Sequence, residues 1–102
     1  MEITTSGTTL ELSGDFDVRS TGEVREALYF LLDQERSDLV IDLSEVHAVD
    51  VTALRVLAVA SRQASRRGRS VTLRGCGPSV LRMLHISRMI RLLDVERVPV
   101  AA

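Results

Sequence analysis

Apolar and polar positions alternate near the start of the chain and then change to a helical spacing. Leu10 and Leu12 alternate with polar neighbours, which is the period of a half-buried strand and predicts one over residues 8–16. A short edge strand over 3–5 precedes it and forms a hairpin with it. A helix over 21–35 is predicted by the capping-box pattern Ser-Thr-Gly-Glu at its start and by four apolar positions at helical spacing. These positions are Val24, Leu28, Leu31 and Leu32.

The rest of the chain continues to alternate between strand and helix. Residues 39–41 are apolar without a break, as in a central strand covered on both faces, and the chain then runs into a predicted turn. A helix is predicted over 51–67, where Gly68 supplies the stop. The remaining predicted elements are a strand at Val71 and Leu73, a helix from Pro78 to Ile86, a helical turn over 89–92 and a last strand over 95–100.

This order of elements predicts a single small α/β domain over residues 1–102. A βαβαβα core follows the N-terminal hairpin, and its helical connections favour right-handed crossovers and a mixed, mostly parallel sheet of four or five strands. A chain of 102 residues is long enough for one hydrophobic core, and its apolar content of 45% argues against disorder.

Composition narrows the class of protein. No segment approaches the ~20 consecutive apolar residues that a membrane-spanning helix needs. The N-terminus, Met1 to Thr4, lacks the basic and apolar regions of a signal peptide. Cys76 is the only cysteine, which fits a reducing compartment and predicts a packing residue. We therefore expect a cytoplasmic protein that does not contact a membrane.

Charge is divided very unevenly along the chain. Residues 1–50 hold 12 acids and 3 arginines, a balance of −9, whereas residues 51–102 hold 2 acids and 10 arginines, a balance of +8. Such asymmetry predicts charged faces. The chain has three aromatic residues and none lies among the clustered arginines, so base stacking and nucleic-acid binding are not expected. The clustered arginines are Arg62, Arg66, Arg67 and Arg69, and they lie at or just past the end of a predicted helix.

The sequence contains no convincing catalytic or metal-binding pattern. The two histidines, His47 and His85, do not stand in a metal-ligand spacing. The segment 75–78, Gly-Cys-Gly-Pro, lies between a strand and a helix but lacks the lysine and spacing of a nucleotide-binding loop. We therefore expect a protein that is not an enzyme and has no catalytic residue, metal or cofactor.

Asp50 and Thr52 stand at the start of the predicted helix over 51–67. Asp50 is a good N-cap, and Thr52 then lies in the first turn, where backbone N–H groups could hold an attached phosphate. The alternative is that Asp50 only caps the helix and Thr52 only fills a polar position. Loops that follow parallel strands meet at one edge of a sheet, so the acids Asp15, Asp17 and Glu45 are expected to crowd around Thr52.

Five short motifs follow one another along the chain: Gly14-Asp15-Phe16-Asp17, Arg25-Glu26-Ala27-Leu28, and the segments 42–54, 66–73 and 78–84. Together these motifs resemble the STAS domain, and in particular the anti-sigma factor antagonists. In that family the central pattern reads roughly D-L-S-x-V-x-x-[IV]-D-S-S-G-L. Three positions depart from the family pattern: Val51 replaces a serine, Ala53 a glycine, and Arg88 a glycine after a helix.

The resemblance implies a protein-binding switch that controls transcription. An anti-sigma factor that is itself a serine/threonine kinase would bind the unphosphorylated domain and release a sigma factor. Phosphorylation of Thr52, the residue aligned with the family's acceptor, would end the complex, and a phosphatase would reset it. ATP and Mg²⁺ would belong to the kinase, and the domain would be a monomer or weak dimer. The expected partner-binding rim consists of Asp15, Asp17, Glu45, Asp50, Val51 and Ala53.

Two other roles within the same family remain open. STAS domains also serve as accessory subunits of lipid-transport ABC systems, with a pattern resembling D-T-G-G-L, in which threonine directly follows the aspartate. Val51 occupies that place here and counts against this role. STAS domains also act as scaffolding units without phosphoregulation, or as tails of anion transporters.

Overall fold

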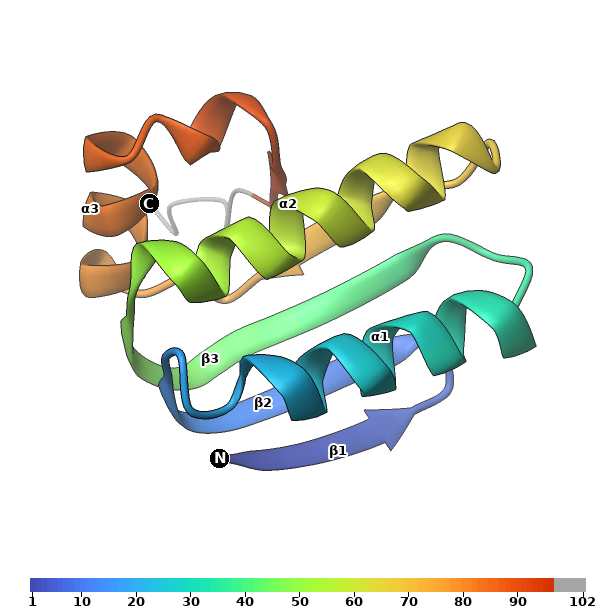
Figure 1. The fold of residues 1–102 in the computed structure, drawn as a ribbon, viewed down its shortest axis with the longest axis horizontal. Helices are drawn as coiled ribbons and strands as arrows, with labels where there is room; N and C mark the ends of the chain where they lie inside the picture. The colour runs from blue at the N-terminus through green and yellow to red at the C-terminus, as the bar shows by residue number, and fades with distance from the viewer. Residues whose placement is uncertain (97–102) are drawn as a thin grey trace, which may run out of the picture.

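The computed structural model describes residues 1–96 and shows a five-stranded mixed sheet with strand order β1-β2-β3-β4-β5 (Figure 1). β1 pairs antiparallel with β2, and every other neighbouring pair is parallel. This confirms the predicted α/β fold with its N-terminal hairpin. The strands are β1 Glu2–Ser6, β2 Thr9–Phe16, β3 Leu39–Val49, β4 Val71–Arg74 and β5 Asp94–Val95. The helices are α1 Thr21–Gln34, α2 Val51–Arg66, α3 Pro78–Ile86 and the short 3₁₀ helix η1 Met89–Arg91.

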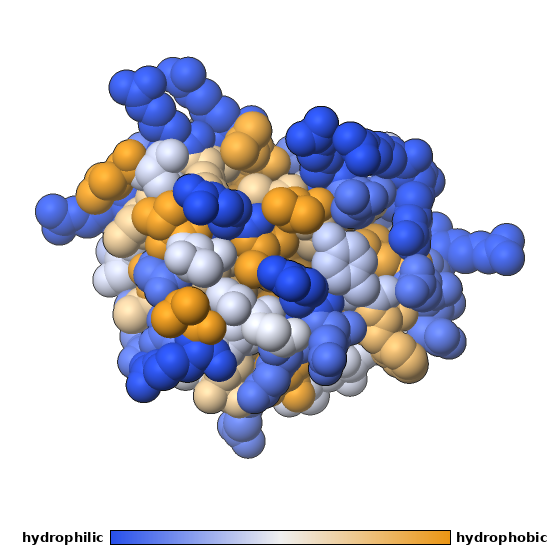
Figure 2. Space-filling view, viewed as in Figure 1, coloured by the Kyte–Doolittle hydropathy of each residue, from blue (hydrophilic) through white to orange (hydrophobic). Residues whose placement is uncertain are grey.

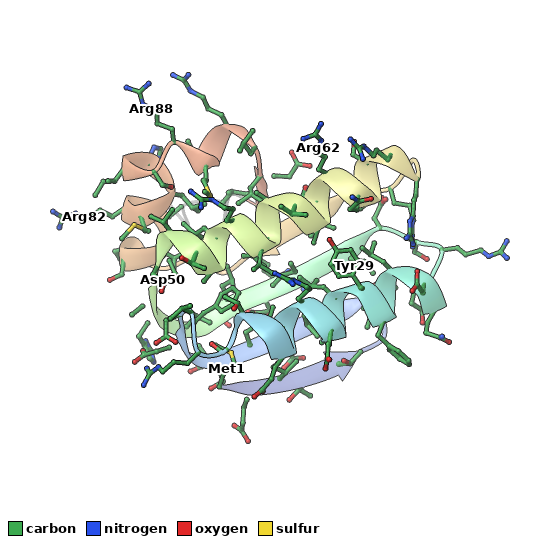
Figure 3. All side chains as sticks on the ribbon, in the orientation of Figure 1. Met1, Tyr29, Asp50, Arg62, Arg82 and Arg88 are labelled. Carbon is green, nitrogen blue, oxygen red and sulfur yellow. The ribbon has the colours of Figure 1, made fainter. Side chains whose placement is uncertain are left out.

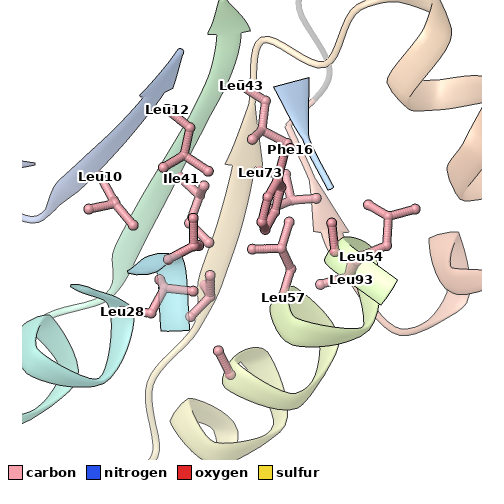
Figure 4. Packing of buried hydrophobic residues seen from close by; sticks show 14 of the residues in the cluster. Leu10, Leu12, Phe16, Leu28, Ile41, Leu43, Leu54, Leu57, Leu73 and Leu93 are labelled. Atoms are coloured by element: carbon pink, nitrogen blue, oxygen red, sulfur yellow. The ribbon is translucent and has the colours of Figure 1, made fainter. Parts of the chain in front are cut away.

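Helices α1 and α2 lie side by side over one face of the sheet, and α3 packs against β3 near the edge where α2 begins (Figure 1). The core between α1, α2 and the sheet is aliphatic, with Phe16 fully buried among leucines (Figure 4). All four apolar positions predicted for α1 are buried. Within residues 1–96, no helix is both long enough and apolar enough to cross a membrane.

Most predicted boundaries agree with the structure to within one or two residues, because caps and stop signals act locally. α3 begins at Pro78 and ends at Ile86, as predicted. The predicted last strand over 95–100 is observed only as β5, since residues 97–100 lie outside the described part of the chain.

The predicted turn after residue 41 is wrong, because β3 continues as one strand to Val49. The register of its pairing with β2 explains how the polar residues after Leu43 stay in the strand. Between Glu11 and Ser13 on β2 the chain advances two positions, while the paired residues on β3 advance three, from Asp42 to Glu45. A second such step follows before Val49. Two bulges therefore absorb the extra residues and keep this polar segment in the ladder.

The expected capping box at the start of α1 is not formed. Ser20 is the N-cap residue, but its side chain makes no capping hydrogen bond to the helix. Its buried hydroxyl instead accepts a hydrogen bond from the Asp17 N–H at 3.3 Å and lies 3.2 Å from the Asp17 carbonyl oxygen. Ser20 thus holds the loop between β2 and α1 in a tight turn.

Two turns adopt left-handed backbone conformations with different consequences. Gly75, directly after β4, has φ +70°, and a Cβ added there would lie 2.8 Å from the Cβ of Ser44 on β3. Arg88 has φ 64° between α3 and η1, at the position where the family pattern carries glycine. An L-residue in this conformation is strained by roughly 1–2 kcal/mol.

Candidate functional site

The loop after β2 and the start of α2 lie next to each other at the edge of the sheet where the parallel strands β2 and β3 end (Figure 1). Two hydrogen bonds between distant segments join them. The Asp50 N–H donates to the Phe16 carbonyl oxygen at 3.3 Å, and the Val18 N–H donates to Asp50 Oδ2 at 3.1 Å. The edge is therefore built from segments more than 30 positions apart.

Asp50 caps α2 as the sequence predicts (Figure 3). Its extended backbone, with φ −109° and ψ 172°, places Oδ1 2.8 Å from the Ala53 N–H. Because Oδ2 accepts from Val18, the two carboxylate oxygens serve two different segments. Asp50 fixes the start of α2 and the neighbouring loop at the same time.

The residues around this cap divide into exposed and buried sets. Thr52 is exposed, and beside it Val18 and Val51 are 62% and 37% exposed. Ala53 is fully buried, so its expected place in a partner-binding rim is wrong: its side chain points into the core. Val18 was missed because a single valine between two charged residues in a loop carries no signal in the sequence; only its position next to Val51 gives it a place in this surface.

Thr52 faces a basic hollow, not an acidic rim. A hollow of about 370 Å³ lies between α1 and α2, and no acid lines it. Tyr29 projects from α1 into the space beside α2 (Figure 3). On this helix-covered face, apolar patches are interrupted by charged side chains (Figure 2). The lining residues are Arg25, Tyr29, Thr52, Arg55, Val56 and Val59.

Asp15 and Asp17 lie at the same edge but in a neighbouring hollow of about 380 Å³, with Glu23 and Ser20. Asp17 is paired with Arg19, whose Nη2 lies 2.6 Å from Asp17 Oδ2. The hydrogen bonds from Arg19 lower the pKa of Asp17 below its usual range. The positive charge of Arg19 therefore offsets the negative charge of Asp17, and the edge is less acidic than the sequence indicates.

Glu45 does not lie at this edge, because β3 continues past it. It pairs with Ser13 in the middle of the sheet. The expectation that Glu45 crowds around Thr52 is therefore wrong. It lines a hollow on the sheet with other polar side chains of β1, β2 and β3, including Glu2, Glu11 and Asp42.

The clustered arginines lie at the far end of α2, as expected, and part of the cluster is structural. Arg67 pairs with Asp33 at 2.9 Å. Arg69 donates from Nη2 to the Leu32 carbonyl oxygen at 2.7 Å and from Nη1 to the carbonyl of Glu35. These bonds satisfy carbonyl groups at the C-terminal end of α1.

Within residues 1–96, His, Cys, Asp and Glu side chains form no group of three that could hold a metal ion. Cys76 is half-buried, and this burial raises the pKa of its thiol to about 11. The thiol is therefore protonated near neutral pH and a weak nucleophile. What the edge presents is a hydroxyl, two valines and several charges on a rigid frame, an arrangement suited to binding a partner.

Comparison with known proteins identifies the family of this domain. A family model described as "Mlab, STAS domain" matches residues 1–94. Comparison with curated protein sequences gives no match.

Solved structures that share the fold include two anti-sigma factor antagonists and a sulfate transporter family protein. A proposed anti-sigma factor antagonist from Thermotoga maritima has a TM-score of 0.79 and 15% identity over 96% of this chain and 86% of that chain. An anti-sigma factor antagonist from Mycobacterium paratuberculosis has a TM-score of 0.77 and 19% identity over 96% and 85%. A sulfate transporter family protein from Wolinella succinogenes has a TM-score of 0.70 and 20% identity over 92% and 80%. With the family match over 94 residues, the fold and the Asp50-capped edge lead to one conclusion: the chain belongs to the STAS domain family.

Proposed function

We propose that this protein is a partner-switching domain that binds an anti-sigma factor of the serine/threonine kinase type, and that Thr52 is its phosphoacceptor. The observation that carries the proposal is the exposed Thr52 in the first turn of α2, directly after the Asp50 cap. The shared fold of anti-sigma factor antagonists supports it.

The binding surface is the edge formed by the β2–α1 loop and the start of α2. Val18 and Val51 are apolar anchors that gain about 25 cal/mol for each Å² removed from water. Asp15, the Asp17–Arg19 pair and Glu23 supply a polar margin around them. This is the layout of a small apolar centre with a hydrated rim.

Phosphorylation changes the centre of that surface. The γ-phosphoryl group of ATP transfers to Thr52 Oγ1, ADP leaves, and the hydroxyl proton passes to a base of the kinase. The phosphate adds a charge of about −1.5 to −2 next to Val51. A partner packed on Val51 must then desolvate this charge, which weakens the complex. A phosphatase hydrolyses the phosphoester and restores binding.

The first test is phosphorylation by the cognate kinase. Incubation with kinase, ATP and Mg²⁺ should add one phosphate to the protein, and Thr52→Ala should abolish the gain in mass. Thr21→Ala is the matched control, because Thr21 occupies the first turn of α1 but donates its hydroxyl to the Val18 carbonyl at 3.1 Å. Modification that maps to Thr21 or Ser44 would refute the assignment.

The second test separates binding from folding. Thr52→Glu should lower affinity for the kinase by at least tenfold, since a carboxylate that a packed partner must desolvate can cost about 2 kcal/mol or more. The thermal midpoint should move by only a few degrees, about the effect of a surface substitution in a domain of this size. If the protein binds an ABC-transporter ATPase subunit and no kinase, the accessory-subunit role replaces this proposal.

A further inference from the structure

The hollow between α1 and α2 contains two arginines whose charges are not matched within it. Arg25 comes from α1 and Arg55 from α2, and both line the same space of about 370 Å³ as Thr52. No acidic residue lines this space. The ion pairs found within residues 1–96 involve Arg19, Arg67 and Arg74, so neither Arg25 nor Arg55 has a carboxylate partner there.

Helix spacing places Arg55 beside Thr52, and the packing of α1 beside α2 brings Arg25 to the same hollow. Arg55 follows Thr52 by three residues on α2, and residues three apart are neighbours on one helix face, with about 5–6 Å between Cβ atoms. Arg25 precedes Tyr29 by four residues on α1, and both line the hollow from the opposite side. A group attached to Thr52 therefore borders a space that arginines from two different helices line.

We infer that Arg25 and Arg55 form a cradle for the phosphate of phosphorylated Thr52, an inference that rests on the proposed function. A phosphate monoester offers three acceptor oxygens and close to two negative charges, and guanidinium groups bind such oxygens in pairs. The Ala53 N–H already donates to the Asp50 carboxylate and the Leu54 N–H to the Asp50 carbonyl, so neither of these two N–H groups is free for the phosphate.

The cradle gives the phosphorylated state its own structure. The phosphate draws Arg25 and Arg55 over the hollow, so the groove between α1 and α2 loses both its free positive charges and its access to Tyr29. Phosphorylation thus alters the surface along α2 as far as Val59, and not only at Val51. A partner that contacts α1 and α2 together senses both changes.

The test is a ³¹P NMR pH titration of protein that carries phosphothreonine at position 52, installed during translation so that no kinase is needed. The second pKa of a free phosphate monoester is about 6. Each arginine should lower it by about half a unit, the effect of a unit charge about 6 Å away in water. Arg25→Gln and Arg55→Gln should each reverse half of the shift, and the double variant all of it.

Arg82→Gln is the matched control, because Arg82 is exposed on α3 and points away from the hollow (Figure 3). It should leave the phosphate pKa unchanged, while 1 M salt should narrow the difference in phosphate pKa between wild type and the double variant by screening both arginines. Equal phosphate pKa values in wild type, the double variant and the control would overturn the cradle. Failure of the cognate kinase to modify Thr52 would instead refute the proposed function, since the titration does not use it.

Discussion

Removing the Asp50 carboxylate should destabilise two segments at once, and the two losses can be measured separately. In Asp50→Ala the Ala53 N–H loses its cap, which costs about 1 kcal/mol, and the Val18 N–H loses its acceptor, which costs about another 1 kcal/mol. The free energy of unfolding should fall by about 2 kcal/mol. For a domain of about 100 residues this lowers the thermal midpoint by about 8–16 °C.

Asp50→Ser separates the two contributions. A serine hydroxyl caps a helix as well as a carboxylate does, but it offers one oxygen in place of two. The Ala53 bond should survive and the Val18 bond should be lost, so the free energy of unfolding should fall by only about 1 kcal/mol. Urea unfolding monitored by circular dichroism gives both values.

The amide NMR spectrum tests the same reasoning at individual atoms. The Val18 amide proton should shift upfield in both variants, because it loses a carboxylate acceptor, whereas the Ala53 amide should shift strongly only in Asp50→Ala. Asp15→Ala is the control, since Asp15 is exposed and should change stability by less than about 0.5 kcal/mol. Equal destabilisation by Asp50→Ser and Asp50→Ala would refute the division of the two oxygens.

Three further predictions concern the turns and the thiol. Arg88→Gly should raise the free energy of unfolding, measured in urea, by about 0.5–1 kcal/mol, because glycine adopts the left-handed conformation without strain. As a control, Arg82→Gly within α3 should lower it by about 1 kcal/mol. Gly75→Ala should lower it by about 2–4 kcal/mol through strain and the clash with Ser44. Burial raises the pKa of the Cys76 thiol from 9.0 to about 11. Iodoacetamide should therefore alkylate Cys76 at pH 8 about 100-fold more slowly in the folded protein than in the unfolded chain, and alkylation should accelerate as pH rises toward 11.

Features determined by local chemistry could be predicted from the sequence. The four buried positions of α1 follow from a helical period. The start of α2 follows from the capping chemistry of Asp50, and the start of α3 from Pro78, which suits a first helical turn. In each case the residues that determine the structure are neighbours along the chain.

Features determined by pairing between distant segments could not be predicted. The polar segment after Leu43 resembles a turn, yet the ladder with β2 keeps it in β3 through two bulges. Because a turn was expected there, Glu45 was predicted to lie at the edge beside Thr52, whereas it lies within the sheet. The basic surroundings of Thr52 were missed for the same reason: Arg55 lies only three residues away, but Arg25 approaches through the packing of α1 on α2.

A physical reason favours Thr52 over the similar Thr21 as the proposed switch. Thr21 and Thr52 both lie in the first turn of a helix. The Thr21 hydroxyl donates to the Val18 carbonyl, so a phosphate there would break a bond that holds the β2–α1 loop. Within residues 1–96 the Thr52 hydroxyl has no hydrogen-bond partner, while the adjacent Asp50 carboxylate supplies the bonds that fix α2. Because the stabilising bonds and the modifiable hydroxyl belong to different residues, Thr52 can gain a charge while the fold that presents it stays intact.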